Sequence, residues 1–273
     1  MIWKGIKLEF YRAFHSIWYV GALLGATAIA LAQFVTRVIP KTQVIGSGDS
    51  MDYPYSVFNS CLMLELRLGY EYVFYYSIIL LAAVPYAVSY YTDIKDGYIK
   101  NICTRMDTKG YLVGKYLAVF VSAGSICVIP LIINTYLTAM VLPSLTPEVA
   151  TALFPAGGGC FATGVFHTYP YIYVIIYLAI DFVMAGLFSC LALVASKIVN
   201  NRYMVMFFPF IVFLVFQTVI TFTPFSPLAP FCIMDPHQMT WEKAGYILSG
   251  IAALLLITVT GFKIAGGKKH DAL

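Results

Sequence analysis

Long apolar stretches alternate with short polar segments along most of this chain. Six of the stretches hold at least the roughly 20 residues that a helix needs to cross the hydrocarbon core of a bilayer. Because backbone polar groups in lipid must be satisfied within their own segment, we expect each stretch to form a transmembrane helix. The six predicted spans are residues 17–39, 70–91, 111–142, 171–195, 203–222 and 244–264.

Residues 1–15 precede the first span and have the pattern of an amphipathic helix. Their apolar residues recur at the spacing of one helical face, and the basic residues fall mostly off it. We predict a helix that lies in the membrane interface with its basic side chains toward the lipid headgroups. The alternative is a basic tail that leads into the first span. The apolar face consists of Trp3, Ile6, Phe10 and Phe14, and the basic residues are Lys4, Lys7 and Arg12.

The longest charged run, residues 93–110, is held between the second and third predicted spans. An apolar residue at every fourth position would form one stripe along a helix, and the other faces carry charge. Such an element rests its stripe on lipid or protein and presents its charges to a partner in the cytosol. The stripe is Ile94, Tyr98, Ile102 and Met106, and the charged and polar positions are Lys95, Asp96, Lys100, Asn101 and Arg105.

Three connecting segments fall on the opposite side of the membrane in this scheme. Residues 40–69 have the composition of a polar loop that ends in a short mixed piece, and residues 143–168 hold no lysine or arginine. Residues 223–243 are rich in proline, and their apolar middle is too short to cross a bilayer. We expect that middle to form a re-entrant or surface helix.

The overall composition supports the same class of protein. Of the 273 residues, 60% are hydrophobic and 11% are charged, whereas soluble domains are about a quarter charged. No cleavable signal peptide is evident, so we expect the first span to serve as its own signal. The net charge of +4 is too small and too scattered to indicate a nucleic-acid partner.

The positions of lysine and arginine predict the orientation of the chain. With both termini in the cytoplasm, thirteen basic residues lie inside and four lie outside. The predicted fold class is therefore an all-α polytopic membrane protein with six transmembrane helices, both termini cytoplasmic, and an interfacial N-terminal helix. The four outer residues are Arg37, Lys41, Arg67 and Lys243.

Cysteine and histidine give no metal or redox pattern. Six cysteines occur singly, without CxxC spacing, and the four histidines are not clustered in the sequence. A disulfide between Cys160 and Cys232 in the outer segments is one option, and free thiols are the other. We predict no metal ligands and no cofactor bound by this chain itself.

Catalytic motifs are also missing from the sequence. The string nearest to a P-loop is Gly110–Lys115, which is one residue too short and is followed by Tyr116. No HExxH motif is present. We therefore predict that the chain is not an enzyme and hydrolyses no nucleotide by itself.

A few polar residues fall inside predicted spans. Asp181 lies deep in the fourth span and is a candidate proton, cation or substrate site; the alternative is a neutral or hydrogen-bonded carboxyl between two helices. Asn134 and Gln217 are explained by hydrogen bonds between helices. Gly21 and Gly25 form a small-xxx-small pair that would let another helix approach closely.

The span layout and two sequence patches resemble the ABC-2-type permease family, the membrane subunits of type V ABC exporters. The first patch contains Asp93 or Asp96, Gly97, Ile99-Lys100-Asn101, Arg105 and Tyr111-Leu-Val-Gly-Lys115. The second contains Ser196-Lys197, Asn200-Asn201-Arg202 and Pro209-Phe210. Together with the spans, the resemblance covers nearly the whole chain.

This resemblance implies a bacterial cytoplasmic membrane protein that works with a separate cytosolic ABC ATPase, which binds ATP and magnesium. A second permease chain, identical or paralogous, completes the pathway, and the cargo is a peptide, an antibiotic or another amphipathic molecule. The resemblance also implies which residues contact the ATPase: Asp93, Asp96, Gly97, Lys100, Asn101 and Arg105, supported by Trp3, Lys7 and Phe10.

Two other functions remain open from the sequence. An ion-coupled secondary transporter or channel would use Asp181 as its ion site. A non-transporting membrane protein, either an immunity protein or a scaffold, would need no transport residue.

Overall fold

The computed structural model describes residues 2–44, 55–64, 69–103, 108–147, 160–238 and 243–267. Within these ranges the chain is all-helical and contains no strand. Five helical stretches are long and apolar enough to cross a membrane. They contain α2 (Ile17–Gln33), α7 (Thr108–Val141), α9 (Pro170–Ala195), α10 (Arg202–Thr221) and α12 (Ala244–Gly267). The prediction of a helical, multi-span membrane protein is thereby confirmed.

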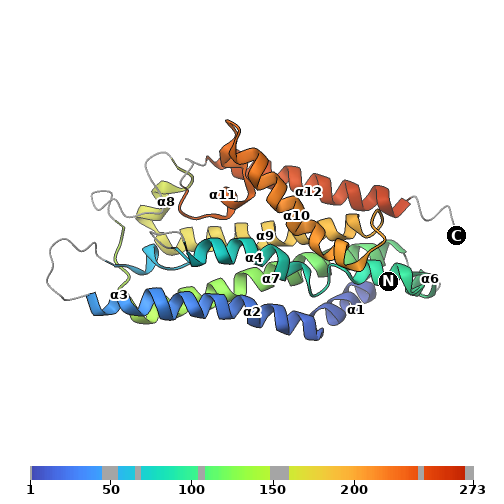
Figure 1. Cartoon of the computed structure of the whole chain (residues 1–273), viewed down its shortest axis with the longest axis horizontal. Coiled ribbons are helices and arrows are strands. Elements are labelled where there is room, and N and C mark those ends of the chain that lie inside the picture. Colours follow the sequence, from blue (N-terminus) through green and yellow to red (C-terminus); the bar gives the residue numbers. More distant parts are fainter. Residues whose placement is uncertain are drawn as a thin grey trace.

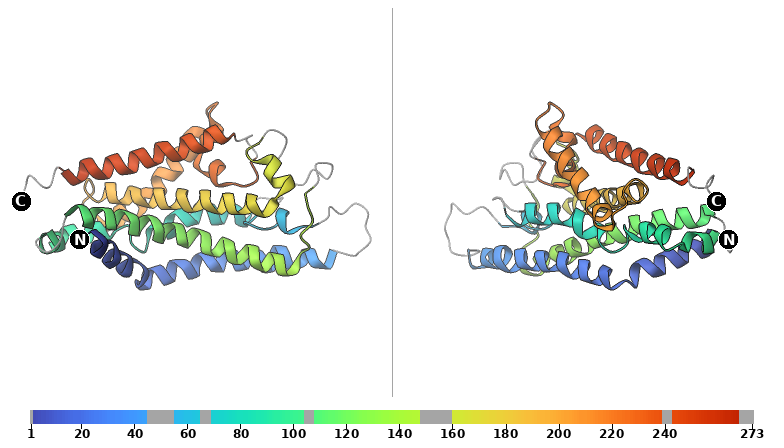
Figure 2. Two further views of the ribbon diagram at one scale, coloured as in Figure 1. Left: turned by 180° about the vertical axis from the view of Figure 1, so that it is seen from behind. Right: turned by 45° about the vertical axis from the view of Figure 1, so that its right-hand side comes forward.

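The long helices form an elongated bundle with α7 and α9 at its centre. Figures 1 and 2 show α2, α4, α7 and α9 running side by side along the long axis, while α10 crosses them obliquely. α9 is the most buried of the long helices, and α10 and α12 are the least buried. α10 and α12 therefore present broad apolar surfaces at the periphery.

The contact between α7 and α9 depends on two glycines. Phe182 of α9 lies over Gly124 of α7, and Phe120 of α7 lies over Gly186 of α9. A Cβ atom on either glycine would fall within 2.7 Å of the opposing ring. The predicted small-residue pair, Gly21 and Gly25, makes no such close helix contact. Gly21 faces open space, and Gly25 lies at ordinary contact distance from the side chain of Leu81 on α4.

The second predicted span, residues 70–91, is not a continuous helix. α4 (Tyr70–Ala83) ends before a turn at 84–88, and the chain then continues in α5 (Ser89–Lys95) and α6 (Tyr98–Cys103). Pro85 accounts for the break, since it lacks the amide hydrogen and disfavours helix at the residue before it. At about 1.5 Å per residue, the 14 residues of α4 reach about 21 Å, less than a bilayer core.

The helix of the first span is longer than predicted. α2 continues through a π-helical turn, Phe34–Val38, into α3 (Ile39–Val44). The expected polar loop at 40–69 is therefore partly helical. Its residues 55–64 include the short helix Val57–Asn59 and a tightly buried run that ends in Leu62, Met63 and Leu64.

The proline-rich segment after α10 forms the expected short helix. α11 (Pro230–Met234) follows the turn Ser226–Leu228, and its residues Phe231, Ile233 and Met234 are buried. The ring of Phe231 stacks on Tyr72 of α4 with 4.7 Å between ring centroids. This proline-rich segment thereby fills the space between α4, α9, α10 and α12.

The bundle has two distinct ends. α1 (Ile2–Phe14), α6 and the last turn of α12 lie together at one end, and α3 and α8 (Thr163–Thr168) lie at the opposite end (Figure 1). We call them the α6 end and the α8 end. The first and last described helices therefore start and finish at the same end of the molecule.

The N-terminal helix packs on α7 by the face that carries its small residues. Gly5, Glu9 and Ala13 are buried, whereas Trp3 is 83% exposed. Gly114 of α7 permits the contact, because a Cβ there would lie 3.1 Å from backbone atoms of α1. Ile6, Phe10 and Phe14 of the predicted apolar face are half-buried beside this contact.

Candidate functional site

Four charged side chains meet at the α6 end of the bundle, and we call them the ion cluster: Glu9 and Arg12 of α1, Asp93 of α5 and Lys115 of α7. The ammonium of Lys115 lies 2.6 Å from Glu9 Oε2 and 2.6 Å from Asp93 Oδ2. Glu9, Asp93 and Lys115 are all buried. Three helices are therefore joined by ion pairs away from solvent.

Arg12 closes the ion cluster on its more exposed side. Its Nη2 donates to Asp93 Oδ1 at 2.9 Å, and its Nη1 donates to Glu9 Oε1 at 3.1 Å. The guanidinium also lies 4.7 Å from the ring centroid of Tyr98, which brings α6 into contact with the cluster. Each acid thus faces two bases, and the formal charges sum to zero.

Hydroxyl groups complete the hydrogen bonding of the two acids. Tyr111 donates to Asp93 Oδ2 at 2.6 Å, and Tyr86 donates to Glu9 Oε2. Tyr86 lies in the turn after α4, so α4 is also attached to the cluster through this turn. Buried charges are tolerated where such donors and opposite charges satisfy them.

The protonation state of Asp93 follows from these partners. Burial by itself raises the pKa of Asp93, but the hydrogen bond from Arg12 and the charge of Lys115 outweigh it, so the pKa lies below its ordinary value of 3.8. Burial likewise lowers the pKa of Arg12, and the hydrogen bond to Asp93 more than restores it. Both groups are therefore charged, and their ion pair joins α1 to α5.

The residues predicted to contact an ATPase divide into three groups. Asp93 and Phe10 face the protein interior, since Asp93 is buried in the ion cluster and Phe10 packs against the core. Trp3, Lys7 and Asp96 are exposed, and Gly97 turns the chain between α5 and α6 with a φ of +69°. Arg105 lies outside the described residues, as do the side chains of Lys100 and Asn101.

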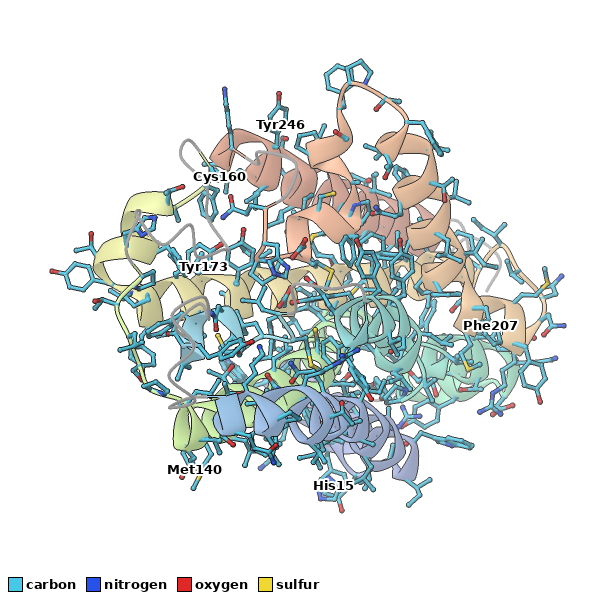
Figure 3. All side chains as sticks on the ribbon, turned by 60° about the vertical axis from the view of Figure 1, so that its left-hand side comes forward. His15, Met140, Cys160, Tyr173, Phe207 and Tyr246 are labelled. Atoms are coloured by element: carbon cyan, nitrogen blue, oxygen red, sulfur yellow. The ribbon has the colours of Figure 1, made fainter. Side chains whose placement is uncertain are left out.

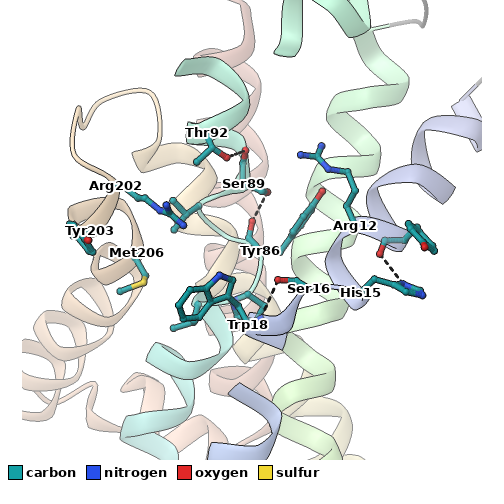
Figure 4. Close-up of a pocket in the computed structure, with 14 residues that line it drawn as sticks. Arg12, His15, Ser16, Trp18, Tyr86, Ser89, Thr92, Arg202, Tyr203 and Met206 are labelled. Atoms are coloured by element: carbon teal, nitrogen blue, oxygen red, sulfur yellow. Dashed lines mark hydrogen bonds between the residues drawn. The ribbon is translucent and has the colours of Figure 1, made fainter. Parts of the chain in front are cut away.

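A cavity of about 760 Å³ opens beside the ion cluster, between the start of α2, the turn at 84–88 and the start of α10. Figure 4 shows Arg12 and Arg202 on opposite sides of it, with Trp18 and Tyr86 between them. Cationic groups at the rim and aromatic rings inside give the cavity an amphipathic lining. A ligand with an anionic head and an apolar body would satisfy both kinds of surface.

The polar residues predicted inside spans all make contacts between elements. Asp181 is buried, and Tyr75 of α4 donates to its Oδ2 at 3.3 Å. Asn134 of α7 donates to Gln33 of α2 at 2.8 Å. Gln217 of α10 accepts from the backbone amide of Phe231 at 2.8 Å. The other carboxylate oxygen of Asp181 has no hydrogen-bond partner in the described part of the chain.

A second buried group of titratable side chains lies where the loop after α11 meets the first turn of α4, and we call it the acid–histidine cluster: Glu71, Asp235 and His237. His237 Nδ1 lies 3.0 Å from Glu71 Oε1 and 3.4 Å from Asp235 Oδ1. Burial lowers the pKa of His237, but hydrogen bonds to Asp235 and Glu71 outweigh burial and raise the pKa to about 10.

Neighbouring residues hold the loop of the acid–histidine cluster in place. Tyr173 of α9 donates to the carbonyl of Pro236, and Gln238 donates to the Tyr173 hydroxyl. Cys160 Sγ lies 3.9 Å from the carbonyl oxygen of Gln238. Figure 3 labels Tyr173 and Cys160 in this region, with Met140 and Phe207 at the periphery. Cys160 and Cys232 are both thiols, so the disulfide considered from the sequence is not formed.

Sequence reasoning missed both clusters for the same reason. Arg12 and Asp93 are 81 positions apart, and Glu71 and His237 are 166 positions apart. A local signal existed in each case: an acidic residue on the small-residue face of α1, and an acid and a histidine flanking Pro236. The P-loop-like string also has a structural explanation, since Gly114 admits α1 and Lys115 forms the ion pairs.

Comparisons with known proteins add no family to this description. No family model matches the chain, and neither a curated protein nor a solved structure matches it.

Proposed function

We propose that this chain is the membrane subunit of an ATP-driven exporter in a bacterial cytoplasmic membrane, powered by a separate cytosolic ATPase. In this proposal the chain crosses the membrane six times, and residues 70–91, which comprise α4, the turn at 84–88 and the first residues of α5, form the second crossing. The α6 end faces the cytoplasm. The location of α1 and the last turn of α12 at one end of the bundle supports this orientation, as does the excess of basic residues in the same segments.

The ion cluster is the observation that carries the proposal. It joins α1, α5 and α7 through Glu9, Asp93 and Lys115, and these groups are buried where ion pairs are costly to separate. A displacement of α5 or α1 by a partner therefore also displaces α7, because the ion pairs hold the three helices together. An element that receives force from outside the membrane needs such a stiff joint.

The surface available to the ATPase lies next to this joint. Lys95 and Asp96 are exposed at the turn between α5 and α6, and Trp3 and Lys7 are exposed on α1. We assign the ATPase contact to this surface. Asp93 does not contact the ATPase in this proposal, contrary to the expectation from the sequence. Instead, it holds α5 in position from the protein interior. ATP binding would favour one of two arrangements of the bundle, since a partner shifts an equilibrium only by binding one state better.

The cavity beside the ion cluster supports an amphipathic cargo. Arg202 would attract an anionic head, since the charge of Arg12 is balanced within the ion cluster, and Trp18 and Met206 would contact an apolar body. Because the cavity borders the turn at 84–88, movement of α5 would alter its shape. Apolar side chains exposed on α10 and α12, such as Phe216 and Leu256, suit a second permease chain or lipid.

A crosslinking experiment tests the proposed contact. A photoreactive amino acid at position 96 or 3 should capture an ATP-hydrolysing subunit in cells. The same amino acid at position 43, exposed near the other end of the bundle, should not. The purified complex should hydrolyse ATP, and mass spectrometry should identify a P-loop in the captured chain. Capture at none of the positions, together with a complex devoid of ATPase activity, would contradict the proposal.

A second candidate function is ion-coupled transport through Asp181. It is favoured by one observation: Asp181 is buried in α9, and one of its oxygens lacks a described hydrogen-bond partner. Proteoliposomes containing the chain alone separate the two functions. Uptake driven by an ion gradient without nucleotide, and lost in Asp181→Asn, would establish the second candidate and refute the first.

A further inference from the structure

The proposed function uses none of the three residues of the acid–histidine cluster. Its three members come from two separate elements, the first turn of α4 and the loop that follows α11. Their potential ligand atoms all lie within 4.8 Å of one another, and all three residues are buried. Three potential ligand atoms so close together could bind one metal ion.

The distances agree with a tetrahedral metal site. Zinc binds histidine nitrogen and carboxylate oxygen at about 2.0–2.1 Å, so ligand atoms on a regular tetrahedron are about 3.3 Å apart. His237 Nδ1 lies 3.0 Å from Glu71 Oε1 and 3.4 Å from Asp235 Oδ1. Two of the three ligand-atom pairs are therefore close to the required spacing, and the third pair lies within 4.8 Å.

The charges agree with the same assignment. Two carboxylates and a neutral imidazole carry a net charge of −2, which one divalent cation would cancel in a buried setting. Imidazole with carboxylates is a donor set that favours first-row transition metals over magnesium or calcium. The backbone amide of His237 donates to Asp235 Oδ1 at 2.8 Å, which orients that carboxylate.

We propose that Glu71, Asp235 and His237 form a binding site for one divalent transition-metal ion, with zinc as the probe. Bound metal joins the loop after α11 to the first turn of α4. It thereby fixes the proline-rich segment between α10 and α12 against the centre of the bundle. This inference does not depend on the proposed export function.

Metal binding to the purified full-length chain tests the site. The protein is prepared in detergent without a polyhistidine tag, stripped with a chelator and titrated with zinc chloride. We expect one zinc per chain by elemental analysis after gel filtration, and a rise in the thermal unfolding midpoint. Magnesium at the same concentration should produce neither effect.

Variants locate the binding. His237→Ala should weaken zinc binding at least about tenfold and abolish the rise in unfolding midpoint. Glu71→Gln keeps the shape of the side chain and should weaken binding similarly, so the test does not depend on one variant folding. His167→Ala is the matched control, because His167 bonds to a backbone carbonyl outside the cluster. A zinc stoichiometry far below one would overturn the proposal and leave an imidazolium ion pair; unchanged binding in both cluster variants would overturn it equally.

Discussion

Replacing Lys115 by methionine removes the ammonium group that lies 2.6 Å from both Glu9 and Asp93. Methionine preserves most of the volume, so packing changes little. Two buried carboxylates then face the single positive charge of Arg12, whose side chain is 31% exposed. Breaking a buried ion pair by removing one partner costs about 3–5 kcal/mol, because a charge is left uncompensated away from water.

The expected loss of stability is measurable by thermal unfolding in detergent. One kcal/mol corresponds to about 2–4 °C for a chain of this size class, so Lys115→Met should lower the unfolding midpoint by about 6–20 °C. Lys95→Met is the matched control. Lys95 is exposed on α5, and the change should shift stability by no more than about 0.5 kcal/mol.

A second substitution, Glu9→Gln, should change the free energy of unfolding in opposite directions in the two proteins. Glu9→Gln should destabilise the wild-type protein, because it removes a partner of Lys115. In the Lys115→Met protein the same change should be stabilising, by about 1–3 kcal/mol, because it removes the unpaired carboxylate. If Glu9→Gln destabilises both backgrounds equally, the ion cluster is not a coupled unit and the reasoning is refuted.

Three further predictions concern packing, pH and topology. Gly186→Ala should lower the free energy of unfolding by about 1–3 kcal/mol. The new Cβ would lie 2.6 Å from the Phe120 ring and 2.8 Å from the Phe120 carbonyl oxygen. Gly245 faces open space, so Gly245→Ala should leave stability unchanged in the same unfolding assay. Because the pKa of Asp93 is lowered in the folded state, its contribution to stability is present above its ordinary pKa of 3.8 and is lost as pH falls further. The thermal unfolding midpoint should therefore fall steeply below that pH. An equally steep dependence of the midpoint on pH in Asp93→Asn would contradict this prediction. A fluorescent reporter fused after Leu273 should be active in the cytoplasm, and a periplasmic reporter fused there should be inactive; the opposite result would reverse the orientation.

The spans could be predicted because their physical requirement is local. A helix in lipid must satisfy its backbone within one segment and bury apolar side chains over about 20 residues, so length and hydropathy suffice. The stretches beginning at 111, 171, 203 and 244 all correspond to long helices, and the stretch beginning at 17 continues further than expected. The stretch at 70–91 is the exception, because Pro85 breaks a helix whose composition alone looked continuous.

The faces of the helices were decided by packing instead. Hydropathy predicted an apolar face on α1 for the membrane interface and did not indicate which face would pack on the protein; in the structure Gly5, Glu9 and Ala13 are buried. Small residues let two helix backbones approach closely, and a charged residue on that face is stable only beside an opposite charge on another helix. The partner, Lys115, looked from the sequence like part of a defective nucleotide motif.

The sequence by itself therefore determined that this protein is helical, that it belongs in a membrane, and roughly where its helices run. The tertiary structure decided which charges meet. Glu71 and His237 are 166 positions apart, and no periodicity along one helix records a contact over that separation. Hydrophobic burial depends on the composition of each segment, whereas ion pairs and metal-ligand geometry depend on positions that exist only after the segments have packed together.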